Sequence, residues 1–214
     1  RKLRERGAEA HAKWQEKFDA WAAANPEGKA LFDRMQARKL PENFAAELPE
    51  WDEGDSIATR KASEATIQAL AAAVPEMWGG SADLAGSNNT VIKGAHSFGP
   101  ESITTGAWDA KPYGRNLHFG IREHAMSAIM NGIALHGNTR VYGGTFLIFS
   151  EYQYPAVRLG ALMSTDTYYV WTHDSIGLGE DGPTHQPVET LTALRAIPNL
   201  SVIRPADANE TAQA

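Results

Sequence analysis

The chain has 214 residues, of which 43% are hydrophobic and 21% charged, as in an ordinary globular protein that can bury a core. Its formal net charge of −6 argues against general nucleic-acid binding, which needs a basic surface to neutralise phosphates. The absence of cysteine excludes disulfide frameworks, zinc–thiolate sites and thiol nucleophiles. No apolar run approaches the roughly 18 residues of a membrane span. We therefore expect no nucleic acid, no membrane and, by default, a cytoplasmic location.

The first 58 residues are more densely charged than the rest and predict a helical connector. Residues 1–24 are rich in the strong helix formers Ala, Glu, Lys and Arg. Asn25-Pro26 ends this helix, and a second one is expected at about 27–39. Such a segment cannot form a core alone. We expect 1–58 to connect a missing upstream domain to a domain at 59–214, truncated at its C-terminal end.

From residue 59 onward, predicted helices alternate with predicted strands. Ile121, Ala125, Ile129 and Ile133 lie four apart and predict the buried face of one helix. Asp207 is expected to be the N-cap of a last helix. This alternation indicates an α/β fold, an open and mostly parallel sheet with helices on both faces, whose ligands bind at the carboxyl ends of the strands. The other expected helices are 61–73, 149–163 and 188–196, and the expected strands are 77–81, 140–142, 168–172 and 200–203.

Two loops place an acidic residue where it could be functional. Asp83 lies in the glycine-rich stretch 79–88, where a turn with Asp83 as a helix cap would explain it equally well. Glu123 opens a helix, and the helix macrodipole favours a carboxylate there whatever its function. It also lies between Ile121 and Ala125 on the expected buried face. A carboxyl group buried without a cation favours its protonated form, which can donate a proton.

Three aromatic residues, Phe146, Phe149 and Tyr152, are spaced by three along the chain. On a helix or a tight turn they share one side and would form an aromatic wall. Spacing alone favours the simpler interpretation, an ordinary hydrophobic core.

The loop 172–187 follows the best-defined strand and contains His173, Asp181 and His185 among several glycines. It is too polar and too rich in glycine for a core, so it predicts a site at the carboxyl end of that strand. A metal site is the less favoured alternative, because no third histidine stands at ligand spacing and thiols are absent.

Together these stretches resemble the transketolase family, and in particular its middle domain, which binds the pyrimidine end of thiamine diphosphate. The family's signature loop resembles residues 179–189 almost letter for letter, from Gly179-Glu180-Asp181-Gly182 to Glu189. Gly-Ser-Ala-Asp-Leu-Ala at 80–85, Gly-Ile-Arg-Glu at 120–123 and Thr-Phe-Leu-Ile-Phe at 145–149 follow the family's order. The resemblance covers about residue 58 to the end and implies the thiamine-diphosphate-binding fold of the pyrimidine type.

The resemblance also implies which residues bind the cofactor. Glu123 matches the glutamate that hydrogen-bonds ring nitrogen N1′ of the aminopyrimidine and favours the imino form, which deprotonates the thiazolium carbon. Phe146, Phe149 and Tyr152 match the pocket around the pyrimidine ring, and Asp83 matches an aspartate near the thiazolium side.

The substrate-binding residues implied by the resemblance form two groups. Arg60, Ser87 and His173 match the residues that hold the phosphate of the sugar, a suitable role for a guanidinium, a hydroxyl and an imidazole. Asp181 and His185 match residues that recognise sugar hydroxyls near the reacting carbon, and His185 joins Glu123 as an expected catalytic residue.

The implied function is that of a transketolase, which transfers a two-carbon ketol unit from a ketose phosphate to an aldose phosphate in the pentose phosphate pathway, with relatives in the Calvin cycle. The implied cofactor is thiamine diphosphate with Mg²⁺ (or Ca²⁺). No metal ligand is expected in this chain, because the Gly-Asp-Gly to Asn stretch of the family would lie upstream. The implied assembly is a homodimer with the active site at the subunit interface. We expect this chain alone to be inactive.

Other hypotheses remain open at this point. Deoxyxylulose-phosphate synthase has a similar Asp-Gly-x-Thr-His-Gln loop, although Arg60 and the full run from Thr172 to Pro183 favour transketolase. Dihydroxyacetone synthase is similar in these motifs. A non-catalytic transketolase-like module and a generic phosphate-binding α/β module are further alternatives.

Overall fold

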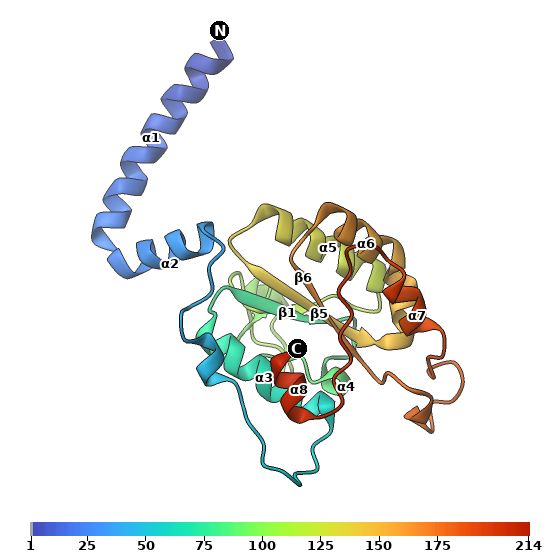
Figure 1. The fold of residues 1–214 in the computed structure, drawn as a ribbon. Helices are drawn as coiled ribbons and strands as arrows, with labels where there is room; N and C mark the ends of the chain where they lie inside the picture. The colour runs from blue at the N-terminus through green and yellow to red at the C-terminus, as the bar shows by residue number, and fades with distance from the viewer. Residues whose placement is uncertain (1) are drawn as a thin grey trace. The chain divides into compact units, whose positions relative to one another are not determined.

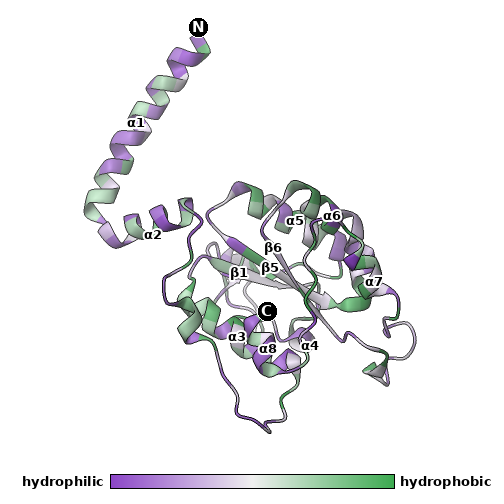
Figure 2. Cartoon of the chain, in the orientation of Figure 1, coloured by the Kyte–Doolittle hydropathy of each residue, from purple (hydrophilic) through white to green (hydrophobic). Residues whose placement is uncertain are grey.

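A computed structural model describes residues 2–214, which form two compact units, one ending at Leu40 and one spanning Pro41–Ala214 (Figure 1). The first unit consists of α1 (Lys2–Ala24) and α2 (Pro26–Gln36), as predicted, with proline at the start of α2. No residue of either helix is buried, and α1 is largely hydrophilic (Figure 2). Phe18 joins the two helices by contacting Trp14 of α1 and Phe32 of α2, at ring-centroid distances of 5.0 and 5.2 Å.

The second unit is built on a six-stranded, all-parallel sheet in the order β3-β2-β4-β1-β5-β6, which confirms the predicted sheet type. Three of its strands were predicted, and β5 extends four residues beyond its predicted end. The other three come from a stretch in which no strand was predicted, and they extend one edge of the sheet. The bounds are β1 Met77–Ser81, β2 Ser97–Phe98, β3 Ala110–Lys111, β4 Asn116–His118, β5 Arg140–Phe146 and β6 Thr167–Thr172.

Helices cover both faces of this sheet, with α3 (Thr59–Ala73) and α8 (Ala208–Gln213) on one face and α5 (Glu123–His136) and α6 (Ser150–Met163) on the other (Figure 1). Neighbouring residues of β5 point to opposite faces: Val141 packs with α5, and Tyr142 packs with α3. The remaining helices are α4 (Ala85–Asn88) and α7 (Thr190–Arg195), with 3₁₀ turns at Phe44–Glu47, Glu101–Ile103, Leu147–Phe149 and Ile176–Leu178.

The predicted buried face of α5 is only partly correct: Ala125 and Ile133 are half-buried, and Ile133 packs against the core cluster that contains Met126 and Met130. Ile121 precedes the helix and is 78% exposed, and Ile129 is 48% exposed, whereas Met126 and Met130 are fully buried. The helix is apolar on more than one side, so the periodicity of its sequence did not select the buried side. The sheet selects it: Gly143 of β5 has no Cβ, and the sulfurs of Met126 and Met130 lie over that position.

Two predictions at the C-terminal end had different outcomes. Residues 200–203 do not form a strand; Leu200 and Val202 pack against the hydrophobic cluster below α6 without joining the sheet. Asp207 is the N-cap of α8 as predicted, since its carboxylate accepts a hydrogen bond of 2.8 Å from the backbone N–H of Glu210.

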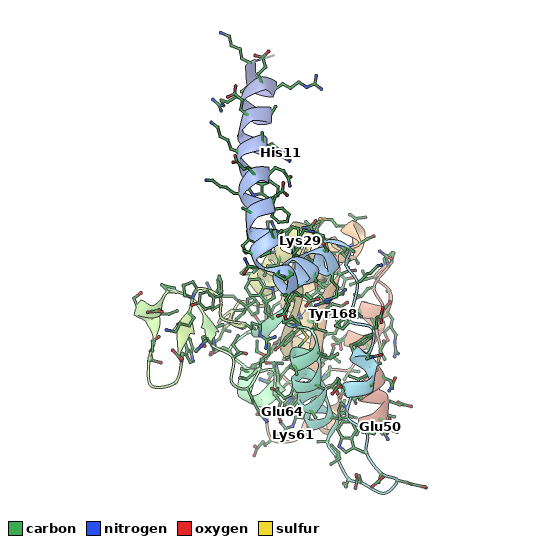
Figure 3. The ribbon with its side chains drawn as sticks, turned by 90° about the vertical axis from the view of Figure 1, so that its left-hand side faces the viewer. His11, Lys29, Glu50, Lys61, Glu64 and Tyr168 are labelled. Carbon is green, nitrogen blue, oxygen red and sulfur yellow. The ribbon has the colours of Figure 1, made fainter. Side chains whose placement is uncertain are left out.

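An ion-pair cluster ties α3 to the segment after α4. The carboxylate of Glu64 lies 2.9 Å from the Nζ atoms of both Lys61, its neighbour on α3 (Figure 3), and Lys93. Hydrogen bonds from these two ammonium groups lower the pKa of Glu64.

Candidate active site

The carboxyl ends of the parallel strands β1, β5 and β6 lie next to one another at one end of the sheet. Ser81 pairs with Gly144 and Phe146 pairs with Thr172, so the segments that leave these strands start side by side. The predicted site loops therefore converge, as expected for an open parallel sheet.

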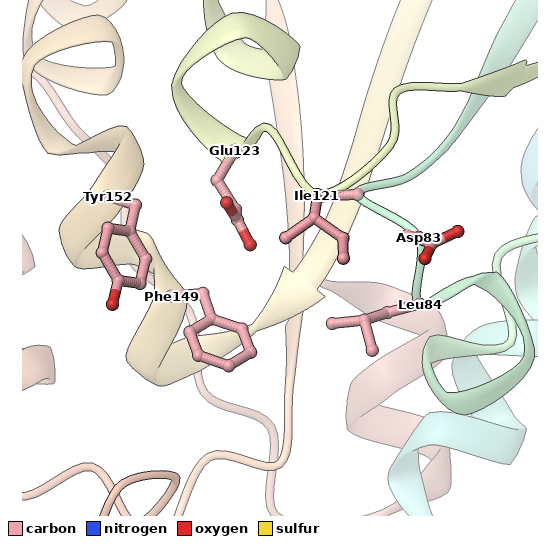
Figure 4. A pocket seen from close by; sticks show the side chains of 7 residues that line it. Asp83, Leu84, Ile121, Glu123, Phe149 and Tyr152 are labelled. Atoms are coloured by element: carbon pink, nitrogen blue, oxygen red, sulfur yellow. The ribbon is translucent and has the colours of Figure 1, made fainter.

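A cavity of about 530 Å³ opens at the carboxyl ends of the strands (Figure 4). Its walls are mostly apolar, and Glu123 points into it from the first turn of α5, between Tyr152 and Ile121. Glu123 is only 8% exposed, and no hydrogen bond or ion pair within residues 2–214 reaches its carboxylate. A carboxyl group that faces a cavity without a protein partner is available to hydrogen-bond a ligand there. The cavity is lined by Ala82, Asp83, Leu84, Ile121, Glu123, Phe149 and Tyr152.

The three predicted aromatic residues do not form an ordinary core. Phe149 and Tyr152 line the cavity with ring centroids 6.0 Å apart, and Tyr152 is 68% exposed. Phe146 is buried behind them and stacks on Phe149 at 5.8 Å with an angle of 7° between the rings. The rings therefore form a continuous wall from the cavity towards the loop after β6.

The two predicted histidines contact this wall. The ring of His173 stacks on Phe146 at 3.8 Å, and the ring of His185 meets Phe149 edge-on at 5.2 Å. The backbone of His173 is left-handed, with φ of +55°, a conformation that few residues other than glycine adopt.

Two charged residues predicted to bind substrate, Arg60 and Asp181, act electrostatically on His173. Burial lowers the pKa of His173, and the Arg60 guanidinium lowers it further, whereas Asp181 acts in the opposite direction. These charges are therefore close enough to act on the ring. Arg60 also donates a hydrogen bond of 3.4 Å from Nη1 to the carbonyl of Ser87. Arg60 thus contacts the backbone of Ser87 and acts electrostatically on His173, and Asp181 acts on the same ring.

Asp83 lies at the cavity, but it does not cap a helix. The N-cap of α4 is Leu84, and its side chain makes no capping hydrogen bond, so the capping alternative is wrong. Asp83 is exposed and has a left-handed backbone, with φ of +63°, which places its carboxylate at the rim of the cavity.

Residues 55–214 match the family described as "Transketolase, pyrimidine binding domain". The chain belongs to this family. It is 68% identical over 210 residues to a transketolase of Mycobacterium tuberculosis, and 54% identical over 212 residues to one of Geobacillus stearothermophilus. These alignments cover 98% and 99% of this chain, and the chain spans about 30% of the length of each relative.

Solved transketolase structures have the same fold. A Pichia stipitis transketolase in complex with sedoheptulose-7-phosphate matches with a TM-score of 0.87 and 51% sequence identity, over 94% of this chain and 29% of that one. A Leishmania mexicana transketolase matches with a TM-score of 0.84 and 46% identity. These matches confirm the transketolase resemblance and the pyrimidine-type α/β fold that it implied.

Sequence analysis missed the buried polar residues beneath this transketolase-family site. Asn88, Thr90 and Thr172 are at most 8% exposed and are hydrogen-bonded to one another through Ser81 or directly. Asn88 and Thr90 lie in a stretch of sequence typical of an exposed polar turn, and Thr172 ends a predicted strand, so no local pattern shows that the three residues meet.

Residues 2–214 contain no group of three or more His, Asp or Glu side chains that could hold a metal ion. No helix in the same range has the length and apolar character needed to cross a membrane.

Proposed function

We propose that this chain is the pyrimidine-binding part of a thiamine-diphosphate-dependent transketolase. The intact protein would transfer a two-carbon ketol unit from a ketose phosphate to an aldose phosphate. One observation carries this proposal beyond family membership: the carboxyl group of Glu123 has no partner within residues 2–214 and faces a cavity lined by the aromatic rings of Phe149 and Tyr152.

The cavity fits an aminopyrimidine ring. Phe149 and Tyr152 offer flat apolar surfaces for stacking, and Phe146 supports Phe149 from behind. Glu123, in its protonated form, would donate a hydrogen bond to ring nitrogen N1′ and could hold or return that proton during the reaction. Asp83 at the rim would lie towards the thiazolium side. When bound, thiamine diphosphate would supply the carbon nucleophile and the electron sink for cleaving the ketose.

The residues around His173 would bind the sugar phosphate. Arg60, His173 and the hydroxyl of Ser87 would hold its phosphate group, which needs cationic and hydrogen-bond-donating partners. Asp181 and His185 would pair with sugar hydroxyls near the reacting carbon, and a sugar of the wrong configuration would leave them unpaired. Besides pairing with a sugar hydroxyl, His185 would also transfer a proton during the reaction.

We further propose that the site is completed by protein outside this chain, so that the chain alone is inactive. Mg²⁺ (or Ca²⁺) and the diphosphate would be bound by an upstream domain, joined to residues 59–214 through the connector 1–58. A homodimer with the active site at the subunit interface is supported by apolar residues beside the cavity: Ile121 is 78% and Tyr152 68% exposed. We also infer a role in the pentose phosphate pathway and a cytoplasmic location.

Glu123→Gln in the intact protein tests the proposal. Glutamine keeps the size of the side chain and can still donate a hydrogen bond, but it cannot release or take up a proton. We expect ketol transfer to fall by about 10²- to 10⁴-fold, the usual contribution of a positioned acid or base, with the fold unchanged by circular dichroism. Glu151→Gln is the matched control, because Glu151 is exposed on α6 beside Tyr152 and does not line the cavity. Unchanged turnover in Glu123→Gln would overturn the proton-transfer role of Glu123 and would favour a phosphate-binding module for this part of the chain.

A further inference from the structure

A chain of hydrogen bonds runs through the interior from β1 to the ring of His173. Ser81 Oγ lies 2.8 Å from Thr90 Oγ1 and accepts a 3.0 Å bond from Asn88 Nδ2. Thr172 Oγ1 donates a 2.8 Å bond to Asn88 Oδ1 and lies 2.8 Å from His173 Nδ1. Asn88 and Thr90 are fully buried, and Ser81 and Thr172 are 3% and 8% exposed.

The sheet holds Asn88 in place at Gly144 of β5. A Cβ added at Gly144 would lie 2.8 Å from Ser81 Oγ and 3.1 Å from Asn88 Nδ2, so only glycine lets these groups approach the strand. With its amide bonded on one side to Ser81 and on the other to Thr172, Asn88 presents its oxygen to Thr172.

This arrangement determines which nitrogen of His173 carries a proton. The amide oxygen of Asn88 can only accept, so the single hydroxyl proton of Thr172 is used in that bond. Towards His173 the Thr172 oxygen can then only accept, and Nδ1 must be the donor. In the neutral ring, Nε2 is therefore left without a proton.

We propose that the hydrogen-bond chain through Asn88 and Thr172 fixes His173 in the Nδ1–H form, so that His173 binds an anion only after Nε2 has taken up a proton. This inference rests on the proposed function, which assigns the phosphate of the sugar to His173. The ligand class is a phosphate monoester or another oxyanion. A bare Nε2 lone pair repels an anionic oxygen, whereas a protonated Nε2 donates a charge-assisted hydrogen bond to it. Asn88 and Thr172 are thus positioning residues.

The charges around the ring make this proton uptake matter near neutral pH. Burial lowers the pKa of His173, as do the Arg60 guanidinium of α3 and the ring of His185, whereas Asp181 and Asp174 of the following loop raise it. Phe146, which stacks on the ring, contributes no charge. Because the pKa is lowered, the free ring is mostly neutral at pH 7. Anion binding must therefore be accompanied by the uptake of one proton from solvent at Nε2. Binding therefore weakens as the pH rises above the pKa of the free ring.

The first test reads the tautomer directly, independently of any ligand. The seven histidines of the chain can be labelled with ¹⁵N, and His173→Gln identifies the signal of His173. We expect a protonated Nδ1 and an unprotonated Nε2 in the neutral ring. Thr172→Val removes the acceptor and should move the proton to Nε2, whereas Thr172→Ser should retain the original form. A neutral Nε2–H ring in the unmodified chain would overturn the inference, since the Asn88 amide would then point the other way.

A second measurement applies to the intact protein and does not depend on the Val variant. Neutron diffraction above the pKa should show deuterium on Nδ1 of His173 and none on Nε2. The reverse pattern would overturn the proposal even if Thr172→Val fails to fold.

The third test measures anion binding with inorganic sulfate, whose charge is constant between pH 5 and 8. In the intact protein we expect sulfate affinity to fall about tenfold per pH unit above the pKa of His173, one proton being taken up per anion. The His173→Gln variant should lose this dependence of sulfate affinity on pH, although it still contains Arg60. If sulfate binding does not change with pH although the ring is in the Nδ1–H form, this inference is overturned and the proposed function is not. No sulfate binding at any pH would overturn the phosphate part of the proposed function, while the tautomer result would still stand.

Discussion

The orientation of α5 makes a prediction that separates the structure from the sequence pattern. Met130 and Ile129 are adjacent on this helix, yet Met130 is fully buried and Ile129 is 48% exposed. The pattern of apolar residues predicted that Ile129, and not Met130, faces the core. Replacing each with alanine asks which of the two residues anchors the helix that carries Glu123.

The expected magnitudes follow from the packing. The Sδ atom of Met130 lies directly over Gly143, only 2.4 Å from where a Cβ would be. The backbone of β5, which is paired with a strand on each side, cannot move in to fill the space that Met130→Ala leaves, so we expect a loss of about 3–4 kcal/mol in the free energy of unfolding. Ile129→Ala removes a half-exposed side chain and adds a better helix former, so its cost should be below about 1 kcal/mol.

Urea unfolding of the two variants and the unmodified chain measures this difference, at a concentration where sedimentation shows a monomer. With a slope of about 1–3 kcal/mol/M, the midpoint of Met130→Ala should fall by about 1 M or more, and that of Ile129→Ala should fall much less. The slopes should remain equal, which shows that only stability has changed. An Ile129→Ala variant that loses as much stability as Met130→Ala would refute the orientation of α5 described here.

Two further predictions concern the sheet and the ion-pair cluster. Gly144→Ala should lower stability by about 1–3 kcal/mol and disturb the His173 signal, because the new methyl group collides with Ser81 and Asn88; an unperturbed ¹⁵N spectrum would contradict this. Glu64 has a pKa below its ordinary value of 4.5, so its ion pairs contribute stability above that pH, and this stability is lost as the pH falls through the lower folded-state pKa. Glu64→Gln should therefore flatten the acid side of the stability curve in thermal melts between pH 3 and 7, and a curve of unchanged shape would argue against these ion pairs.

The sequence by itself determined the class of fold and the location of the site. Alternating helix and strand patterns are local and depend on each segment's own residues, so β1, β6, α3 and α6 were predicted close to their observed bounds. Two loops rich in glycine and polar residues, 79–88 and 172–187, follow predicted strands. A parallel sheet brings the carboxyl ends of its strands together, so the convergence of these two loops could be expected in advance, whereas Glu123 follows β4, which was not predicted.

The tertiary structure alone decided which faces are buried and which polar groups are paired. The face of α5 depends on Gly143 in a strand that the helix reaches only after folding. The three short strands of residues 97–118 exist because they pair with β1 and with one another, not because of their own propensity. Asn88 and Thr172 are 84 residues apart, and no local pattern shows that they form a hydrogen bond. Burial and pairing are properties of contacts between distant segments, and therefore they arise only when the sheet and its two helical layers close.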